Sequence, residues 1–437
     1  MNGRRSIGDD ERRARLAVRH RLAGSARADN PTEVARSLVA LHSTDPATVF
    51  LASAARMPSP SVEAVEGAPR RTRGPSGPAP KAPRAGNTQT HVKSGRTDPV
   101  TLVERALYEE RSLVRILGMR RTLFVVPTEL VPIVHAACTR AIAVTQRRRY
   151  AKLLTEGGIT DDGEAWLDRV GDATLAALEA RGEAFGAELS ADVPELRSRL
   201  SHGEGKKWAG TTSMTTWVLT LLAADERIVR GRPRGSWISS QYSWAPATRW
   251  QPDGEVPLDT AAAQAELAQR WLAAFGPATL ADLAWWTGWT KTATRAALAA
   301  VGAVEVDIDG GTAFVLPDDL EPAPPPEPWV ALLPALDPTA MGWKDRAFYG
   351  GDDKRLYDRS GNVAPTVWSD GRIVGCWAHR ADGEVAVRLL AEVGRDTASA
   401  IDDAARRLGA WLGSTRVTVR SRFRAPIERE LAERPSG

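Results

Sequence analysis

Residues 260–317 read TAAAQAELAQRWLAAFGPATLADLAWWTGWTKTATRAALAAVGAVEVDIDGGTAFVLP, and this stretch decides the fold. Its pattern predicts three helices separated by breaks that contain glycine, and then two short strands joined by an Asp-Gly-Gly turn. The helices are predicted over 261–275, 279–286 and 291–301, and the strands over 304–308 and 313–316. Helix, helix, turn, helix and hairpin in this order predict a winged-helix module, whose third helix enters a major groove.

Weaker copies of the same plan are predicted upstream. For the second copy we expect a helix over 211–224, a strand over 227–230, a turn over 231–235 and a returning strand from Trp237. For the first copy we expect helices over 10–22, 31–41, 46–56 and 102–111, and a hairpin with strands over 113–117 and 122–126. The three modules are therefore assigned to residues 10–140, 141–256 and 257–321.

Two changes in composition mark segments outside these modules. Residues 58–98 are rich in Pro, Gly, Arg, Ala and Ser and hold almost no large apolar side chain, which predicts a disordered insertion. The proline-rich stretch 322–328 marks a boundary. Beyond it, expected strands over 329–333, 364–368, 373–377, 385–390 and 416–424 and a helix over 396–412 predict a strand-rich domain at 329–430. The predicted fold class is α+β, with three tandem winged-helix modules and this small C-terminal α+β domain.

Composition narrows the class of protein. The 437 residues carry 58 Lys and Arg against 54 Asp and Glu, and the resulting charge of +4 is weak support for a nucleic-acid partner. Cys138 and Cys376 lie far apart without nearby Cys or His at ligand spacing, so we expect no metal site, disulfide or cofactor. No apolar run of membrane-spanning length and no signal segment is evident. We therefore expect a cytoplasmic, nucleoid-associated monomer without a membrane span.

Basic residues are grouped on three predicted elements, where they could contact DNA phosphates. One group lies on the helix after Cys138, a second shares one face of the third helix of the third module, and a third alternates with apolar residues along the last strand. These groups are Arg147, Arg148 and Arg149; Lys291 and Arg295; and Arg420, Arg422 and Arg424. A solvated helix face and a role in solubility alone remain the alternatives.

Three segments resemble a known family. They are residues 37–45, residues 278–288 (Ala-Thr-Leu-Ala-Asp-Leu-Ala-Trp-Trp-Thr-Gly) and residues 333–345 (Leu-Pro-Ala-Leu-Asp-Pro-Thr-Ala-Met-Gly-Trp-Lys-Asp). Together they are similar to the bacterial winged-helix DNA-binding family of alkylation- and crosslink-repair glycosylases, of the azinomycin-resistance type. The resemblance covers all but the insertion. It implies a monofunctional DNA glycosylase that hydrolyses the N-glycosidic bond of alkylated or bulky-adduct purines in double-stranded DNA, without a metal or cofactor.

The family's catalytic motif is a Gln, any residue, and then a Gln or Asp. The corresponding place here reads Leu-His-Ser-Thr-Asp-Pro over 41–46, so His42 and Thr44 replace the two catalytic residues. Breaking an N-glycosidic bond builds positive charge on the sugar and requires a positioned water. We expect His42 to hold or deprotonate this water, Thr44 to orient it and Asp45 to supply negative charge. The alternatives are an Asp45 that only caps the next helix, a Thr44 that serves a turn, and a half-buried His42.

The tip of the first hairpin supplies a further set of candidates. The resemblance implies that Met119, Arg120 and Arg121 probe the minor groove around a lesion. Trp285 and Trp286 lie within a predicted helix, which favours core packing over base stacking. Because the catalytic pair is replaced, a non-enzymatic winged-helix DNA-binding protein, either a transcriptional regulator or a lesion-shielding factor, remains the alternative function.

Overall fold

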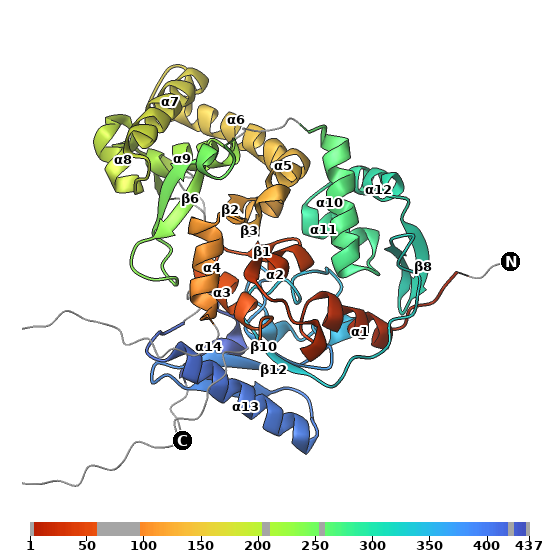
Figure 1. The fold of residues 1–437 in the computed structure, drawn as a ribbon. Coiled ribbons are helices and arrows are strands. Elements are labelled where there is room, and N and C mark those ends of the chain that lie inside the picture. Colours follow the sequence, from red (N-terminus) through yellow and green to blue (C-terminus); the bar gives the residue numbers. More distant parts are fainter. Residues whose placement is uncertain (1–3, 59–96, 203–209, 253–257, 418–423, 434–437) are drawn as a thin grey trace, which may run out of the picture.

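The computed structural model describes residues 4–58, 97–202, 210–252, 258–417 and 424–433 (Figure 1). Helices and small antiparallel sheets alternate along the chain, which makes the fold α+β. Most of the insertion expected at 58–98 lies outside the described residues, as do Arg420 and Arg422. None of the described helices has the length and apolar character needed to cross a bilayer.

The region that decides the fold has the predicted element order. It contains α10 (Thr260–Phe275), α11 (Leu280–Thr287), α12 (Lys291–Ala300), β8 (Val304–Ile308) and β9 (Gly311–Val315). A capping box between Thr279 and Asp282 starts α11, and Gly288 ends it with a left-handed φ of 80°. The Thr290 side chain then caps α12 by accepting a hydrogen bond from Ala293 N. Local signals therefore set these boundaries.

The first region contains the expected helices and an extra strand. Its elements are α1 (Asp9–Arg19), α2 (Pro31–Ser37), α3 (Pro46–Ala54), α4 (Pro99–Glu104), β1 (Leu41–His42), β2 (Leu113–Leu117) and β3 (Leu123–Pro127). The sheet order is β1-β3-β2, with His42 opposite Phe124. The two-residue strand β1 was expected as the end of a helix. Its pairing with β3 joins residues about eighty positions apart, and no local pattern encodes such a contact.

In the second region two predicted elements begin at other residues, and several elements were not predicted, among them the helices Gly163–Arg181 and Gly186–Asp192. The region contains α6 (Arg140–Glu156), α7 (Gly163–Arg181), α8 (Gly186–Asp192), α9 (Met214–Ala224), β4 (Arg199–His202), β5 (Gly210–Ser213), β6 (Ile228–Pro233) and β7 (Tyr242–Pro246). The helix expected from 211 begins at Met214, because Ser213 caps it and the preceding residues pair with β4. The returning strand expected from Trp237 begins at Tyr242. Trp237 instead packs against Phe50 and Trp411.

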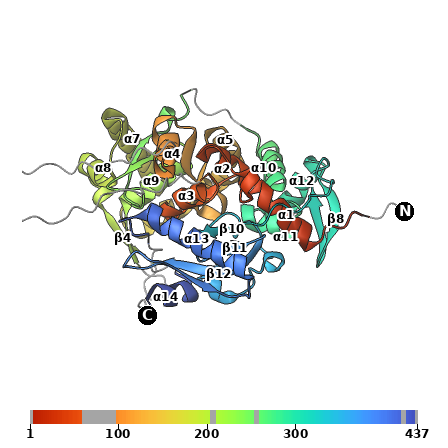
Figure 2. The ribbon, with the colours of Figure 1, turned by 60° about the horizontal axis from the view of Figure 1, so that its bottom comes forward.

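The C-terminal sheet has the order β10-β11-β12-β13. Its elements are β10 (Val330–Leu333), β11 (Thr366–Ser369), β12 (Arg372–His379), β13 (Val385–Leu389), α13 (Arg395–Leu412) and α14 (Pro426–Glu433). Trp377 belongs to the core with α13 and its neighbour Ala378 to the core with α14, so the two helices cover opposite faces (Figure 2). The last strand expected over 416–424 is not seen at 416–417 or at 424, and α14 was not predicted.

The largest hydrophobic core joins the first region, the third region and the C-terminal sheet. Aromatic rings of α10 and α11 form its centre, where Trp271, Phe275 and Trp286 pack together. Phe124 of β3 reaches Trp286, and Trp343 packs edge-on against Phe275. The helices of the second region have a core of their own around α7 and α9.

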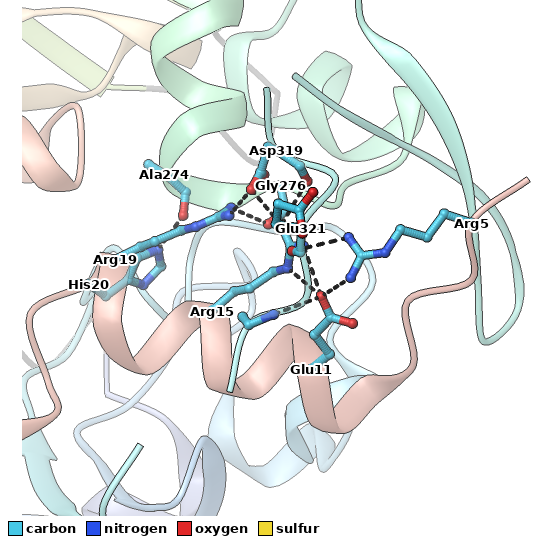
Figure 3. Close-up of polar contacts among 10 residues, drawn as sticks. Arg5, Glu11, Arg15, Arg19, His20, Ala274, Gly276, Asp319 and Glu321 are labelled. Carbon is cyan, nitrogen blue, oxygen red and sulfur yellow. Dashed lines mark hydrogen bonds and ion pairs between the residues drawn. The ribbon is translucent and has the colours of Figure 1, made fainter. Parts of the chain in front are cut away.

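Helix α1 is fixed to the segment that follows β9 by buried charges. Arg15 is 2% exposed and pairs with Glu11 at 2.8 Å and with Asp319 at 2.6 Å. Arg5 and Arg19 approach the same acidic groups from either side (Figure 3). The two pairs with Asp319 join residues about three hundred positions apart, so the start of the described chain is packed onto the third region.

Candidate functional site

His42 lies in the sheet of the first region with its imidazole turned into the protein. The side chain is 4% exposed, and its ring centroid lies 4.9 Å from that of Phe124. Burial, and then the charge of Arg120, lower the pKa of His42 to about 3. The imidazole is therefore neutral at physiological pH. None of the residues that the structure describes forms a hydrogen bond with its buried Nδ1.

Thr44 presents a second buried polar atom of the same kind, because its Oγ1 also has no hydrogen-bond partner in the part of the chain that the structure describes. Ser43, between these two residues, is held firmly. Its Oγ accepts a hydrogen bond of 2.6 Å from Arg115 Nε, and its backbone N donates one of 2.8 Å to Leu123 O. Buried polar atoms without partners are rare in folded proteins. Two of them lie here, on either side of an anchored serine.

Arg115 was not singled out from the sequence. It lies on β2, is 2% exposed, and its guanidinium carbon lies 4.3 Å from the ring centroid of Tyr242. No sequence pattern indicates that Arg115 belongs to the site. An arginine among the apolar residues of a strand is expected at the surface until its partner across the sheet is known. Its contact with Ser43 makes it a positioning residue for the segment that bears His42 and Thr44.

Asp45 has the capping geometry that an Asp-Pro pair predicts. Its Oδ1 accepts a 3.0 Å hydrogen bond from Ala47 N at the start of α3, and the residue is 7% exposed. A capping role and a role in charge stabilisation are compatible, because only one carboxylate oxygen is needed for the cap. The structure thus places a buried carboxylate in the same turn as Thr44.

The tip of the β2–β3 hairpin is the short turn Met119–Arg121. Met119 is fully buried in the core, so only the two arginines of the tip remain available to contact DNA. Arg120 and Arg121 have φ values of 53° and 61°, a left-handed conformation that is uncommon for residues with a side chain. Such strain is concentrated at functional sites in proteins. Arg121 is exposed, whereas Arg120 lies against Trp285.

A groove of about 800 Å³ opens beside this tip. Elements from three regions line it, including the hairpin tip, α6, α10 and the start of α12. Residues on its wall include Arg120, Arg121, Arg140, Gln146 and Thr290. The cap of α12 thus borders a groove lined by several arginines, and helix N-termini and arginines both favour phosphate.

The basic residues expected to bind DNA differ in their surroundings. Lys291 and Arg295 on α12, and Arg148 and Arg149 on α6, are exposed, and the described residues offer them no ion-pair partner. Arg147 instead pairs with Glu164 at 2.7 Å and with Asp168. These two carboxylates compensate its charge within the protein.

Arg424 lies just before α14 and not in a strand. Its Nε is 3.3 Å from Glu428 Oε1, and its side chain is 18% exposed. The structure therefore gives no arginine row at this position, and the described residues leave Arg420 and Arg422 untested.

The segments that carry the family resemblance build the frame of the site. Asp282 Oδ1 accepts hydrogen bonds from the backbone N of Lys344 at 2.8 Å and of Asp345 at 3.1 Å, so the segments 278–288 and 333–345 are joined directly. Asp337 Oδ1 pairs with Arg56 at 2.6 Å, and neither side chain is exposed. Arg56 directly follows α3, whose first turn is capped by Asp45. These residues therefore hold the site in place without taking part in its chemistry.

Acid should destabilise the protein through its buried histidines. Burial is the main cause that lowers the pKa of both His20 and His42 to about 3, whereas an unfolded histidine titrates near 6.5. Between these values only the unfolded chain takes up the protons, so stability is lost as the pH falls below about 6.5. Denaturant unfolding at pH 7, 6 and 5 should show this loss. His42→Gln should reduce the slope of the free energy of unfolding against pH by the equivalent of about one proton. Equal slopes for the variant and the wild type would contradict a neutral, buried His42.

Comparison with known proteins gives one answer by three routes. The family model described as DNA glycosylase AlkZ-like matches residues 85–411. An interstrand DNA cross-link repair glycosylase of Streptomyces sahachiroi is 28% identical over 214 residues, which span 46% of this chain and little more than half, 56%, of that relative. The solved structure of the Streptomyces sahachiroi DNA glycosylase AlkZ shares the fold, with a TM-score of 0.64 and 18% identity over 94% of this chain and 98% of that chain. Because the family model matches most of its length, the chain belongs to the AlkZ-like family of DNA glycosylases.

Proposed function

We propose that the protein is a monofunctional glycosylase that removes alkylated or bulky-adduct purines from double-stranded DNA, including crosslinked bases of the kind named for its Streptomyces relative. One observation carries the proposal. His42 Nδ1 and Thr44 Oγ1, at the two positions where the family has its catalytic pair, are buried polar atoms that find no hydrogen-bond partner among the described residues. A water bound between them would give each atom its missing hydrogen-bond partner. We propose that the protein acts in the cytoplasm, at the nucleoid, as a monomer.

The chemistry follows from the charges of these groups. When the bond from an alkylated purine to its sugar breaks, the sugar becomes cationic and water must attack it. A neutral imidazole can accept a hydrogen bond from that water, which a protonated imidazole could not do, and its pKa of about 3 favours holding the water over taking its proton. The Thr44 hydroxyl would fix the direction of the water. The carboxylate of Asp45, 7% exposed, would favour the positive sugar over the neutral one.

We propose that three winged-helix modules, at 10–140, 141–256 and 257–321, present duplex DNA to this site, with 329–430 as a separate strand-rich domain. Supporting this arrangement, α12 and α6 both contribute residues to the wall of the groove. Beyond those wall residues, α12 exposes Lys291 and Arg295, and α6 exposes Arg148 and Arg149. The third helix of a winged helix reads the major groove, and the basic residues of α6 would contact phosphates.

Binding to undamaged duplex should depend strongly on salt. Each phosphate that the exposed arginines neutralise should contribute about −0.9 to the slope of log affinity against log salt concentration. Replacing both Arg148 and Arg149 by alanine should make the slope shallower, whereas Arg147→Ala should change it little because Glu164 and Asp168 already pair with Arg147. Fluorescence anisotropy at several salt concentrations measures both. A flat dependence for the wild type would contradict the DNA groove.

The experiment for the enzymatic step is release of free base from an alkylated duplex, with the unalkylated duplex as control. The alternative, a non-enzymatic DNA-binding protein, is favoured only by the replacement of the catalytic pair at His42 and Thr44. A regulator should protect one defined sequence, usually as a dimer, in a footprinting experiment. A repair glycosylase should bind with little sequence preference.

A further inference from the structure

Trp285, in the second helix of the third region, is contacted by two arginines for which the proposed reaction has no use. The guanidinium carbons of Arg120 and Arg346 lie 4.1 Å and 5.2 Å from the centroid of its rings. Arg120 belongs to the strained hairpin tip, and Arg346 directly follows the 333–345 segment. Two distant parts of the chain thus bring positive charge to one aromatic side chain.

The hydrogen-bonding capacity of both arginines is largely unused. Neither has a carboxylate within ion-pair distance among the residues that the structure describes, and Arg120 Nε is buried without a hydrogen-bond partner. Arg346 Nε donates to Trp343 O at 3.1 Å. Its two terminal nitrogens reach Gly361 O at 3.5 Å and Met341 Sδ at 3.6 Å, which are long contacts, and its guanidinium group also interacts with the side chain of Tyr357. Both arginines therefore keep part of their donor capacity.

Like charges held together in a partly buried place repel each other. Burial, and then the charge of Arg346, lower the pKa of Arg120 to about 10, which is the direction that mutual repulsion produces. Stacking on Trp285 offsets part of this repulsion. Gly288 also lies close to the tip, because a Cβ at Gly288 would lie 3.4 Å from Arg120 Cγ. The fold thus keeps two cations beside each other with no anion between them.

We propose that Arg120 and Arg346 bind one phosphate of the DNA strand, with Trp285 holding the guanidinium group of Arg120 and Tyr357, 4.6 Å away, holding that of Arg346. Guanidinium forks match phosphate oxygens in pairs, and a phosphate would supply the missing acceptor and the missing negative charge. Arg120 also lines the groove and acts electrostatically on His42. The phosphate is therefore that of a nucleotide close to the base that is removed. The assignment rests on the proposed function, since it requires DNA in the groove.

The test pairs protein variants with DNA that lacks single charges. Lesion-containing duplexes, each with one uncharged methylphosphonate at a different position near the lesion, are titrated with the wild type and with Arg120→Ala/Arg346→Ala. We expect one position at which the wild type loses roughly 10–100-fold in affinity and the double variant loses nothing further. Other positions should affect both proteins equally. Arg355→Ala, which removes an exposed arginine paired with Asp353, should behave as the wild type.

Two further measurements distinguish a failure of the phosphate site from a failure of the proposed function. Arg120→Lys/Arg346→Lys keeps the charge but not the forked geometry, and it should weaken binding at the same single position if the alanine variant proves unstable. One outcome is that the wild type binds DNA while the methylphosphonate at every position still lowers the affinity of both double variants as much as that of the wild type. In that case the phosphate site is wrong and the proposed function stands. If the wild type binds no duplex, the proposed function fails first. Stabilisation by inorganic phosphate without any position-specific effect would overturn the assignment to DNA in favour of a free anion.

Discussion

Replacing His42 by alanine is expected to lower the rate of base release by roughly 10²-fold, because the attacking water is no longer held in position. The imidazole is neutral, buried and packed against Phe124, so the variant also leaves a cavity, and its folded fraction is determined before the rates are compared. Affinity for the same lesion duplex should stay nearly unchanged, because that affinity depends mainly on phosphate contacts. Single-turnover release and anisotropy titration measure the two quantities separately.

The matched control for this variant is His42→Gln, which places the family's own amide at the first position of the motif. An amide can hold a water by hydrogen bonds as an imidazole does, so this variant should retain far more base release than His42→Ala. Release by His42→Ala at the rate of the wild type would show that the water is held elsewhere.

A second large effect is expected where α3 meets the 333–345 segment. Asp337→Ala should lower the free energy of unfolding by about 3–5 kcal/mol, because it leaves the Arg56 guanidinium buried without a counter-charge. Arg56 binds both carboxylate oxygens of Asp337, at 2.6 Å and 2.8 Å, and neither side chain is exposed. Arg56 also donates to Thr339 Oγ1 and to the backbone O of His20, so its loss of Asp337 affects several segments at once.

Urea unfolding tests this with two comparisons. Arg56→Met/Asp337→Leu removes both charges, and it should be more stable than Asp337→Ala because no unpaired charge stays buried. Breaking the exposed pair of Arg355 and Asp353 by Arg355→Ala should cost less than about 1 kcal/mol. Similar losses for the buried and the exposed pair would contradict this account of how the frame is held.

The sequence predicts the third region almost completely, because its boundaries depend on local chemistry. The capping box at Thr279, the left-handed Gly288 and the glycine turn of the hairpin each act within a few residues. Two of the missed elements depend on distant partners. Strand β1 needs β3, and α14 needs the face of the C-terminal sheet that α13 leaves open. The pairing of β4 with β5, in contrast, joins neighbouring segments for which no strand was predicted.

The same distinction holds for the site. His42 and Arg120 could be named from the resemblance, but their proximity follows from a sheet and a hairpin tip that only the fold brings together. Arg115 and Arg346 were missed because their partners, Ser43 and Trp285, lie far away in sequence. The left-handed backbone of the tip turns Met119 into the core, which its position in a polar turn did not indicate.

The central claim is tested most directly by the release of free base from a duplex with one alkylated purine, measured by mass spectrometry under single-turnover conditions with excess protein. The account predicts that the wild type liberates the modified base and leaves an abasic site, and that undamaged duplex yields no base. It also predicts that His42→Ala binds the lesion duplex as the wild type does but releases little. Binding of alkylated and crosslinked duplexes by the wild type without release of any base would contradict the enzymatic account and leave a DNA-binding protein in its place.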